Sequence, residues 1–277
     1  MKVWVDGTVV EADQARVSVF DHGLTVGDGV FETAKVVDGV PFALTRHLDR
    51  LASSARGLGL TPPDDAALRE AVAAALAANA DAVDAGPLRL RITLTGGTSP
   101  LGSDRGGAGR TLVVALAPLT AWAPTAKVVV VPWTRNQRAA TAGLKTTSYA
   151  DNVVALAHAK AYGGTEAVLA NTDGMLCEGT GSNVFLVLGG ELVTPPLSSG
   201  CLAGVTRALV LEWTGAVERD LPIVALLRAE EVFLTSSTRD VQAVHAVGDD
   251  VYPEAPGLLT RQVAATFAER AAADLDP

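Results

Sequence analysis

Lys145 is the residue whose type and setting most directly indicate catalysis. It follows Gly143 and Leu144 and precedes a polar run at 146–149, which places it at the end of a strand or in a turn. Partial burial of an amine penalises its ammonium form, and the neutral amine then becomes available as a nucleophile and a base. A solvated surface lysine is the alternative, so the other motifs must decide.

Glu178 lies in the segment LCEGTGSNVF, between apolar residues and a turn rich in glycine and serine. Acids are rarely buried without a partner. A pyridoxal ring offers one, because a carboxylate beside the ring nitrogen favours the pyridinium form, which stabilises a substrate carbanion. A turn carboxylate that accepts backbone N–H groups is the alternative.

Three further segments could bind an anion such as a phosphate. Gly204, Val205 and Thr206 begin a predicted helix, where unpaired N–H groups and the helix dipole favour negative charge. TSST at 235–238 adds hydroxyl groups at a strand end, and Arg50 could add a bidentate guanidinium. Each feature alone also fits an ordinary helix cap, turn or solvated arginine.

The composition indicates a folded, enzyme-sized chain that acts on small molecules. Its 277 residues are 48% apolar, enough for two modest cores, and a charged fraction of 19% is unlike that of a disordered tail or a coiled coil. A net charge of -9 without a basic block disfavours nucleic acids and anionic membranes as partners.

The chain start and the cysteines indicate a cytoplasmic protein without a metal site. The start lacks the pattern of a secretory signal, and the apolar run at 71–80 is too short to span a bilayer. Cys177 and Cys201 are 24 positions apart, without a CxxC pattern, and are read as buried or site-lining thiols.

Hydrophobic periodicity predicts a mixed fold in two parts. The first part, 1–118, is a small α+β domain with short strands and two helices, at Thr45–Gly57 and Asp64–Ala82; its strands are expected at 3–10, 15–20, 30–39, 88–97 and 110–118. Prolines mark a linker at 119–125.

The second part, 126–277, is predicted to be larger and rich in strands. Asp-Gly and Gly-Gly turns within 166–196 indicate consecutive hairpins, and a strand is expected at 127–133. Amphipathic helices at 204–215 and 255–275 are expected to cover the strands.

Six segments, taken together and in order, resemble the fold-type IV, or class IV, pyridoxal-phosphate aminotransferases, which include branched-chain and D-amino acid aminotransferases and aminodeoxychorismate lyases. The resemblance runs over nearly the whole chain. The segments are GDGVFETAKVVDG (27–39), HLDRL (47–51), GLKTTSYADNVVALAHA (143–159), EGTGSNVF (178–185), LAGVTR (202–207) and VFLTSST (232–238).

The resemblance implies the cofactor pyridoxal 5'-phosphate (PLP) and a role for each matching residue. Lys145 would form the Schiff base and carry the proton between the substrate α-carbon and the cofactor, while Glu178 would hold the pyridine nitrogen. Leu202 would pack against the ring, and Tyr149 would lie near the phenolic oxygen. The phosphate would be bound by Arg50, Val205, Thr206, Ser236 and Ser237.

The expected substrate pocket departs from one branch of the family. D-amino acid aminotransferases carry an arginine and a histidine after the GTSP turn, where this chain has Leu101 and Ser103, so that carboxylate-binding pair is missing. Arg105 lies close enough in sequence to replace it, or is a solvated loop residue. Phe31 and Glu32 lie on the strand that lines the substrate side in relatives.

The function expected first is transfer of an amino group between an amino acid or amine donor and a keto acid. The second is a 4-amino-4-deoxychorismate lyase, which releases pyruvate and yields 4-aminobenzoate. Loss of the carboxylate-binding pair also permits a transaminase for (R)-amines. A non-catalytic small-molecule or interaction module is disfavoured because Lys145 and Glu178 are both present. The resemblance further implies a homodimer.

Overall fold

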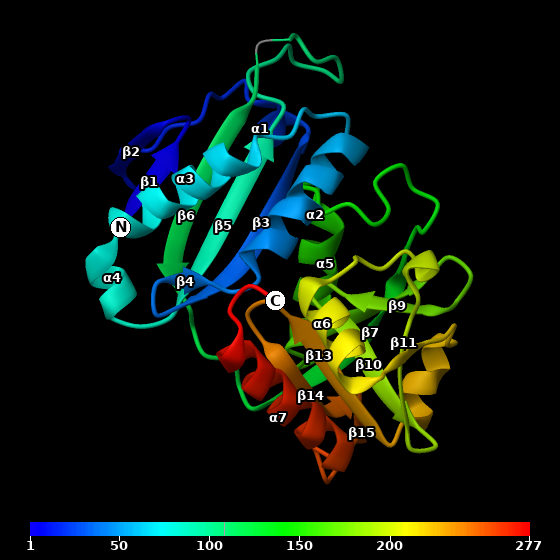
Figure 1. Cartoon of the computed structure of the whole chain (residues 1–277). Helices are drawn as coiled ribbons and strands as arrows, with labels where there is room; N and C mark the ends of the chain where they lie inside the picture. Colours follow the sequence, from blue (N-terminus) through cyan, green and yellow to red (C-terminus); the bar gives the residue numbers. More distant parts are fainter. Residues whose placement is uncertain (108) are drawn as a thin grey trace. The chain divides into compact units, whose positions relative to one another are not determined.

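A computed structural model describes residues 1–107 and 109–277 and contains two compact units (Figure 1). The first unit comprises Met1–Thr120, Leu144–Tyr149 and Leu275–Pro277; the second comprises Ala121–Gly143 and Ala150–Asp274. The main chain thus first crosses between the units within the segment expected to be a linker. Each unit contains its own sheet and helices.

The first unit is a six-stranded antiparallel sheet in the order β2-β1-β6-β5-β3-β4. Its strands are β1 (Lys2–Val5), β2 (Thr8–Glu11), β3 (Gly29–Val37), β4 (Val40–Pro41), β5 (Leu88–Thr95) and β6 (Thr111–Pro118). Its helices are α1 (His22–Thr25), α2 (Leu44–Gly57), α3 (Asp65–Ala77) and α4 (Ala80–Asp84).

The core of the first unit lies on one face of this sheet. In β5, LRLRITLT, the residues Leu88, Leu90, Ile92 and Leu94 are buried together with apolar residues of α2 and α3. Because side chains alternate between the faces of a strand, Arg89 and Arg91 lie on the opposite face. Figure 1 shows α2 and α3 lying across the strands of this unit.

The segment that carries Lys145 belongs to the first unit, although the sequence assigned it to the C-terminal domain. The Phe31 N–H donates to the Lys145 carbonyl at 2.9 Å, and the Thr147 N–H donates to the Gly29 carbonyl at 2.8 Å. These bonds, with an antiparallel bridge between Val30 and Thr146, make the segment a short extension of the sheet beside β3. Pairing with β3 therefore fixes the backbone of the lysine.

The second unit is built on a nine-stranded mixed sheet in the order β12-β11-β10-β13-β14-β7-β8-β9, with β15 paired to β14. Its strands are β7 (Thr125–Arg135), β8 (Glu166–Asn171), β9 (Leu176–Gly179), β10 (Asn183–Leu188), β11 (Glu191–Thr194), β12 (Val217–Glu218), β13 (Glu231–Ser236), β14 (Asp240–Val247) and β15 (Asp250–Val251). Its helices are α5 (Ala150–Ala161), η1 (Leu197–Ser199), α6 (Val205–Thr214), η2 (Ile223–Arg228) and α7 (Leu258–Ala273).

The helices of the second unit cover the sheet as the sequence indicated. Helix α5 packs against β7 and β8, and α6 and α7 pack against β13 and each other. The predicted hairpin turns fall between β8 and β9 and between β10 and β11, where Gly174, Gly189 and Gly190 adopt positive φ angles. Phe185 and Phe233 stack at 4.9 Å between neighbouring strands.

Two predicted elements of the first unit differ in the structure. Residues 15–20 form no strand; Val17, Val19 and Phe20 are exposed there. The helix expected over Asp64–Ala82 breaks between α3 and α4 because the Asn79 side chain bonds both backbone groups of Lys2, the first residue of β1. Tertiary hydrogen bonds, which no local pattern reveals, cause this break.

The N-terminus of α7 is held by a side chain from the sheet. Glu231, the first residue of β13, accepts the N–H groups of Leu259 at 3.0 Å and Thr260 at 2.7 Å. Gly257 precedes the helix without a capping side chain, and a Cβ at this position would overlap the Glu231 carboxylate.

Among the helices of the described residues, none has the length and apolar content that crossing a membrane requires.

Replacing Glu231 with alanine is expected to lower the free energy of unfolding by about 1–2 kcal/mol, because the first turn of α7 then loses its acceptor and its favourable negative charge. Urea denaturation measures this change. Glu254→Gln, at an exposed acid, is the control. An unchanged urea midpoint for Glu231→Ala would show that the carboxylate is not a cap.

Candidate functional site

Lys145 lies beside an aromatic pair in the first unit. Its Nζ is 4.5 Å from the centroid of the Phe31 ring, and the Tyr149 ring meets the same Phe31 ring edge-on at 5.4 Å. The Lys145 N–H donates to Ser54 Oγ of α2 at 3.2 Å, and the residue is half-buried. Three residues predicted for the site, Phe31, Lys145 and Tyr149, are therefore brought together.

Arg91 joins this group, and the sequence reasoning missed it. Its guanidinium carbon lies 3.7 Å from the centroid of the Phe31 ring. In the register of β3 and β5, Phe31 pairs with Thr93 and Thr33 with Arg91, so Phe31 and Arg91 share a face. The alternation in LRLRITLT was the available signal, since it places two arginines on the side of β5 that faces away from the core.

The two arginines of β5 have no acidic partner within residues 1–107 and 109–277. Arg91 donates to Thr93 Oγ1 at 3.3 Å, and neither it nor Arg89 takes part in an ion pair. The Arg89 Nε is buried and makes no hydrogen bond. A buried donor without an acceptor is costly, and guanidinium groups bind carboxylates with paired hydrogen bonds. This face of the first unit can therefore accept an anion.

Glu32 points to the other face of β3, toward α2. Arg50 donates to it twice, through Nε at 2.7 Å and an Nη at 2.8 Å, and His47 Nδ1 lies 2.7 Å from Glu32 Oε2. Although burial alone would raise the pKa of Glu32, the Arg50 charge and hydrogen bonds hold that pKa well below its usual range. Burial lowers the pKa of His47, so the imidazole stays neutral and donates to the carboxylate.

This arrangement bears on two predicted residues. Arg50, expected to bind phosphate, uses its Nε and one Nη on Glu32. Glu32, expected to shape the substrate pocket, is 1% exposed and lies on the opposite face of β3 from Phe31. Both roles stay predictions, and the observed role of the pair is to hold α2 against β3.

The loop after β5 is fastened by Arg105. Its Nε donates to Asp28 at 2.7 Å and a terminal nitrogen bonds the other carboxylate oxygen at 2.5 Å; further bonds reach the carbonyls of Leu58 and Gly59. The hydrogen bonds from Arg105 hold the pKa of Asp28 below its usual range. Leu101 and Ser103, in the same loop, are exposed.

In the second unit, Glu178 is fixed by a backbone amide and a neighbouring cation. Its Oε2 accepts the Leu202 N–H at 2.9 Å, and its Oε1 lies 3.1 Å from Arg135 Nε at the end of β7. The arginine N–H does not point along this 3.1 Å line, so the contact is an ion pair without a hydrogen bond. A carboxylate at this position suits a protonated ring nitrogen.

Asn183 on β10 ties together the segments predicted to hold the cofactor. Its Nδ2 donates to the Leu202 carbonyl at 2.9 Å, and a Cβ on Gly204 would overlap its Oδ1. Asn183 also pairs with Thr235 on β13. The start of α6 and the end of β13 are thereby neighbours.

This region fits a phosphate. Helix α6 begins at Val205 after Gly204, which provides no side-chain cap, and the first N–H groups of a helix have no acceptor within it. The Thr235 hydroxyl is buried and makes no hydrogen bond. Val205, Thr206, Ser236 and Ser237 therefore come from adjacent segments, beside Leu202 and Glu178.

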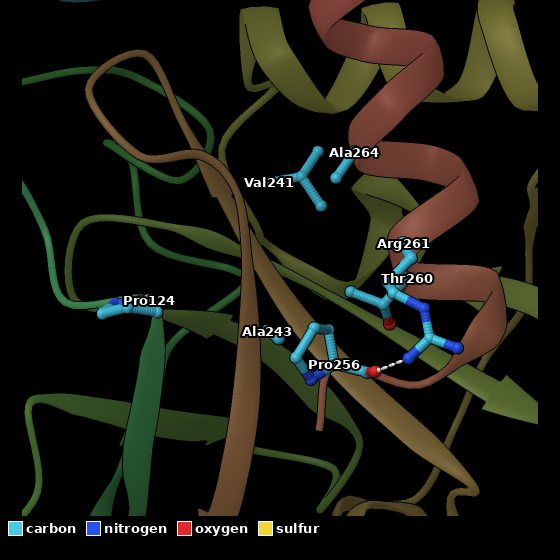
Figure 2. Close-up of a pocket in the computed structure, with 7 residues that line it drawn as sticks. All are labelled: Pro124, Val241, Ala243, Pro256, Thr260, Arg261 and Ala264. Carbon is cyan, nitrogen blue, oxygen red and sulfur yellow. Dashed lines mark hydrogen bonds between the residues drawn. The ribbon is translucent and has the colours of Figure 1, made fainter. Parts of the chain in front are cut away.

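A separate pocket of about 240 Å³ lies between β14 and α7 (Figure 2). Its wall is formed by Pro124, Val241, Ala243, Pro256, Thr260, Arg261 and Ala264. No residue predicted for the site lines it, so this pocket is distinct from the candidate site.

The two cysteines are buried beside this half of the site. Burial raises the pKa of both thiols, which keeps them protonated and unreactive. Among residues 1–107 and 109–277, no group of three or more histidines, cysteines or acids is placed to hold a metal ion.

Comparison with known proteins identifies the family. The family model described as "Amino-transferase class IV" matches residues 29–247. The chain is 32% identical to a putative branched-chain-amino-acid aminotransferase of Methanocaldococcus jannaschii, over 96% of this chain and 95% of that protein. It is 31% identical to a bifunctional aminodeoxychorismate lyase / D-amino acid transaminase of Mycobacterium tuberculosis, over 97% of this chain and 96% of that protein.

A solved structure shares the fold. It is a hypothetical aminotransferase of Mycobacterium tuberculosis in a PLP-bound form, 27% identical, with a TM-score of 0.87 over 97% of this chain and 98% of that chain. The expected family, mixed helix-and-sheet fold and enzyme class are therefore confirmed, and the chain belongs to the class IV aminotransferases.

Proposed function

We propose that this aminotransferase binds PLP and exchanges an amino group between a carboxylate-bearing amino donor and a keto acid. The observation that carries the substrate class is the face of the first unit on which Lys145 and Arg91 flank the same Phe31 ring. Amino acids and keto acids both present a carboxylate next to the reacting carbon. The guanidinium groups of Arg91 and Arg89, which form no ion pair within residues 1–107 and 109–277, provide a counter-charge for it.

PLP supplies an aldehyde that condenses with amines and a ring that draws electrons from the substrate α-carbon. Lys145 Nζ would be the group that holds this aldehyde. As a free amine, the same Nζ would take and return the proton at the substrate α-carbon. Tyr149, packed on Phe31, borders the path of this amine.

The second unit would supply the groups that hold the cofactor. Glu178 would accept the N–H of the ring nitrogen, with the Arg135 guanidinium beside its other oxygen. The N–H groups of Val205 and Thr206, with the hydroxyls of Ser236 and Ser237, bind the phosphate, and Leu202 packs on the ring. Arg50 would add its guanidinium to the phosphate while its bond to Glu32 keeps it oriented.

The geometry favours amino acids over amines without a carboxylate. Three cationic side chains, Lys35, Arg89 and Arg91, share the face of β3 and β5 that carries Phe31 and borders Lys145. An amine that has no carboxylate gains nothing from these charges. Arg105, in contrast, donates to Asp28 and to two carbonyls, so we assign it to anchoring the loop rather than to binding substrate.

Addition of PLP to the purified protein is expected to give a visible absorption band that Lys145→Ala abolishes, because Lys145 is the lysine proposed to bond to the aldehyde. D-alanine, L-leucine and (R)-1-phenylethylamine are then added separately. Loss of the band with one of the amino acids, and its return with a keto acid, would establish transamination and name the donor.

Other results of the same titration have defined meanings. A band that persists with all three donors directs the test to 4-amino-4-deoxychorismate, from which pyruvate release would establish the lyase. A band that forms equally in Lys145→Ala would refute the role of the lysine.

Replacing Arg91 with methionine is expected to lower kcat/KM for the amino acid donor by about 10–100-fold, as for the loss of a charge-assisted hydrogen bond worth roughly 1.5–3 kcal/mol. The slow reaction with an amine lacking a carboxylate should not change. Arg16→Met, at an exposed arginine that bonds only nearby carbonyls, is the control. Equal losses for both donor types would exclude carboxylate binding by Arg91.

We also propose that the chain forms a homodimer through an apolar face of the first unit, as implied by the family. Leu24 is 67% exposed and Leu101 is 74% exposed, and Val19 and Phe20 are exposed beside them. Hydrogen bonds from His22 to the Gly97 carbonyl and from Ser99 to the Phe20 carbonyl bring the two segments together. Water-exposed clusters of this kind commonly mark interfaces.

Sedimentation equilibrium should therefore give the mass of two chains. Leu24→Asp combined with Leu101→Asp should shift the mass to one chain, whereas Val251→Asp, at an exposed position of the second unit, should not. A monomeric wild-type protein would refute the proposal.

The cytoplasmic location stays a prediction from the sequence.

A further inference from the structure

Arg239 and Glu166 form a buried ion pair in the second unit that no predicted role uses. An Arg239 terminal nitrogen donates to Glu166 Oε2 at 2.7 Å, and the two side chains are 6% and 1% exposed. The Arg239 guanidinium also stacks on Trp122, with its carbon 3.9 Å from the ring centroid. A buried charge pair is retained at a cost in desolvation, so its partners indicate what it holds in place.

The arginine end of the pair lies in the turn that follows β13. Its backbone N–H donates to the Ser236 carbonyl at 3.1 Å and to Ser236 Oγ at 3.3 Å, and a second terminal nitrogen donates to Gln242 Oε1 at 3.0 Å. Gln242 in turn donates to the Ala123 carbonyl at 2.7 Å. The guanidinium thus fixes the turn that contains Ser236 and Ser237.

The glutamate end lies under the turn that follows Glu178. Glu166 Oε1 accepts the N–H of Thr180 at 3.1 Å and also its hydroxyl, and Oε2 accepts the Ser182 hydroxyl at 3.2 Å. A Cβ on Gly179 would overlap Ser182 Oγ and press on Glu166 Cγ. The carboxylate therefore sets the backbone path immediately after Glu178.

We propose that Arg239 and Glu166 are a positioning pair, which holds the phosphate-binding turn at a fixed distance from the strand that carries Glu178. The inference rests on the proposed function, because it assigns the pair a purpose in PLP binding. Neither residue is required to touch the cofactor. The cofactor's two anchoring points, the phosphate and the ring nitrogen, are joined by a planar ring and a short ester link, so the groups that bind them must keep a narrow range of spacing.

Arginine suits this position because of its planar shape. Its terminal nitrogens reach Glu166 and Gln242 at once while its plane lies on Trp122. A lysine at this position would keep the charge but could not satisfy this geometry. The conservative variant therefore separates charge from positioning.

The test measures the dissociation constant for PLP by titrating apoprotein and following the visible band. Arg239→Met is expected to raise this constant by about tenfold or more, which equals ~1.4 kcal/mol, and Arg239→Lys by a smaller factor. Glu231→Ala lowers the stability of the same unit through α7 and should leave the constant unchanged. A purely structural pair would make Arg239→Met behave like Glu231→Ala, which would overturn the proposal.

A combined variant guards against misfolding. Arg239→Met alone leaves the Glu166 carboxylate buried without its cation, so Arg239→Met with Glu166→Gln removes both charges. If the residues act as one unit, the double variant should bind PLP no more weakly than the weaker single variant. Additive losses would show that each residue acts separately.

Hydrogen exchange of the apoprotein separates this proposal from the proposed function. Arg239→Met should accelerate exchange in both turns, 179–183 and 236–240, since one pair holds both. Faster exchange in the arginine turn alone would overturn the proposal, whether or not the protein binds PLP. Absence of a lysine-dependent band in the wild type, with exchange coupled in both turns, would refute the cofactor assignment and the pair's purpose in PLP binding, and would leave only the coupling of the two turns.

Discussion

The pairing of the Lys145 segment with β3 is the interaction on which the first half of the site depends. The short β4 bonds only to Val36 and Val37, so the other end of β3 would present unpaired backbone groups at the sheet edge. Residues 145–147 supply the missing partners through the bonds of Phe31 and Gly29. Lys145 is therefore placed by a sheet ladder rather than by a flexible loop, which keeps Nζ beside the Phe31 ring.

Alternation along β3 then separates two electrostatic environments. Glu32 faces α2, where Arg50 and His47 satisfy its carboxylate, while the adjacent Phe31 faces Lys145 and Arg91. Had Glu32 pointed to the side of Phe31, its carboxylate would pair with the arginines and compete with an anionic substrate. The period of two in a strand thus keeps the only acid of β3 away from the cationic face.

Local sequence patterns predicted the turns and helices that depend on residues close together in the sequence. The hairpin turns at Gly174 and Gly189 and the covering helices follow from short segments, and six motifs in order indicated the family. Contacts between distant residues escaped prediction. The helix break at Asn79 depends on Lys2, and the partner of Arg50 is Glu32, 18 positions away. Arg91 was visible in the alternation of β5, but its significance depends on register with Phe31.

Each unit contains buried polar groups whose hydrogen bonds are not satisfied. Glu166 and Arg239 are buried and bond each other, and Glu166 also bonds the turn after Glu178, which is the behaviour of groups that maintain a shape. Arg89 Nε and the Thr235 hydroxyl are buried with no acceptor or donor from the described residues, although folding would favour pairing them. These two groups lie where an anion is proposed to bind: a substrate carboxylate in the first unit and a phosphate in the second. These two unpaired atoms therefore support the proposed chemistry of the ligand, while Glu166 and Arg239 belong to the framework that would hold it.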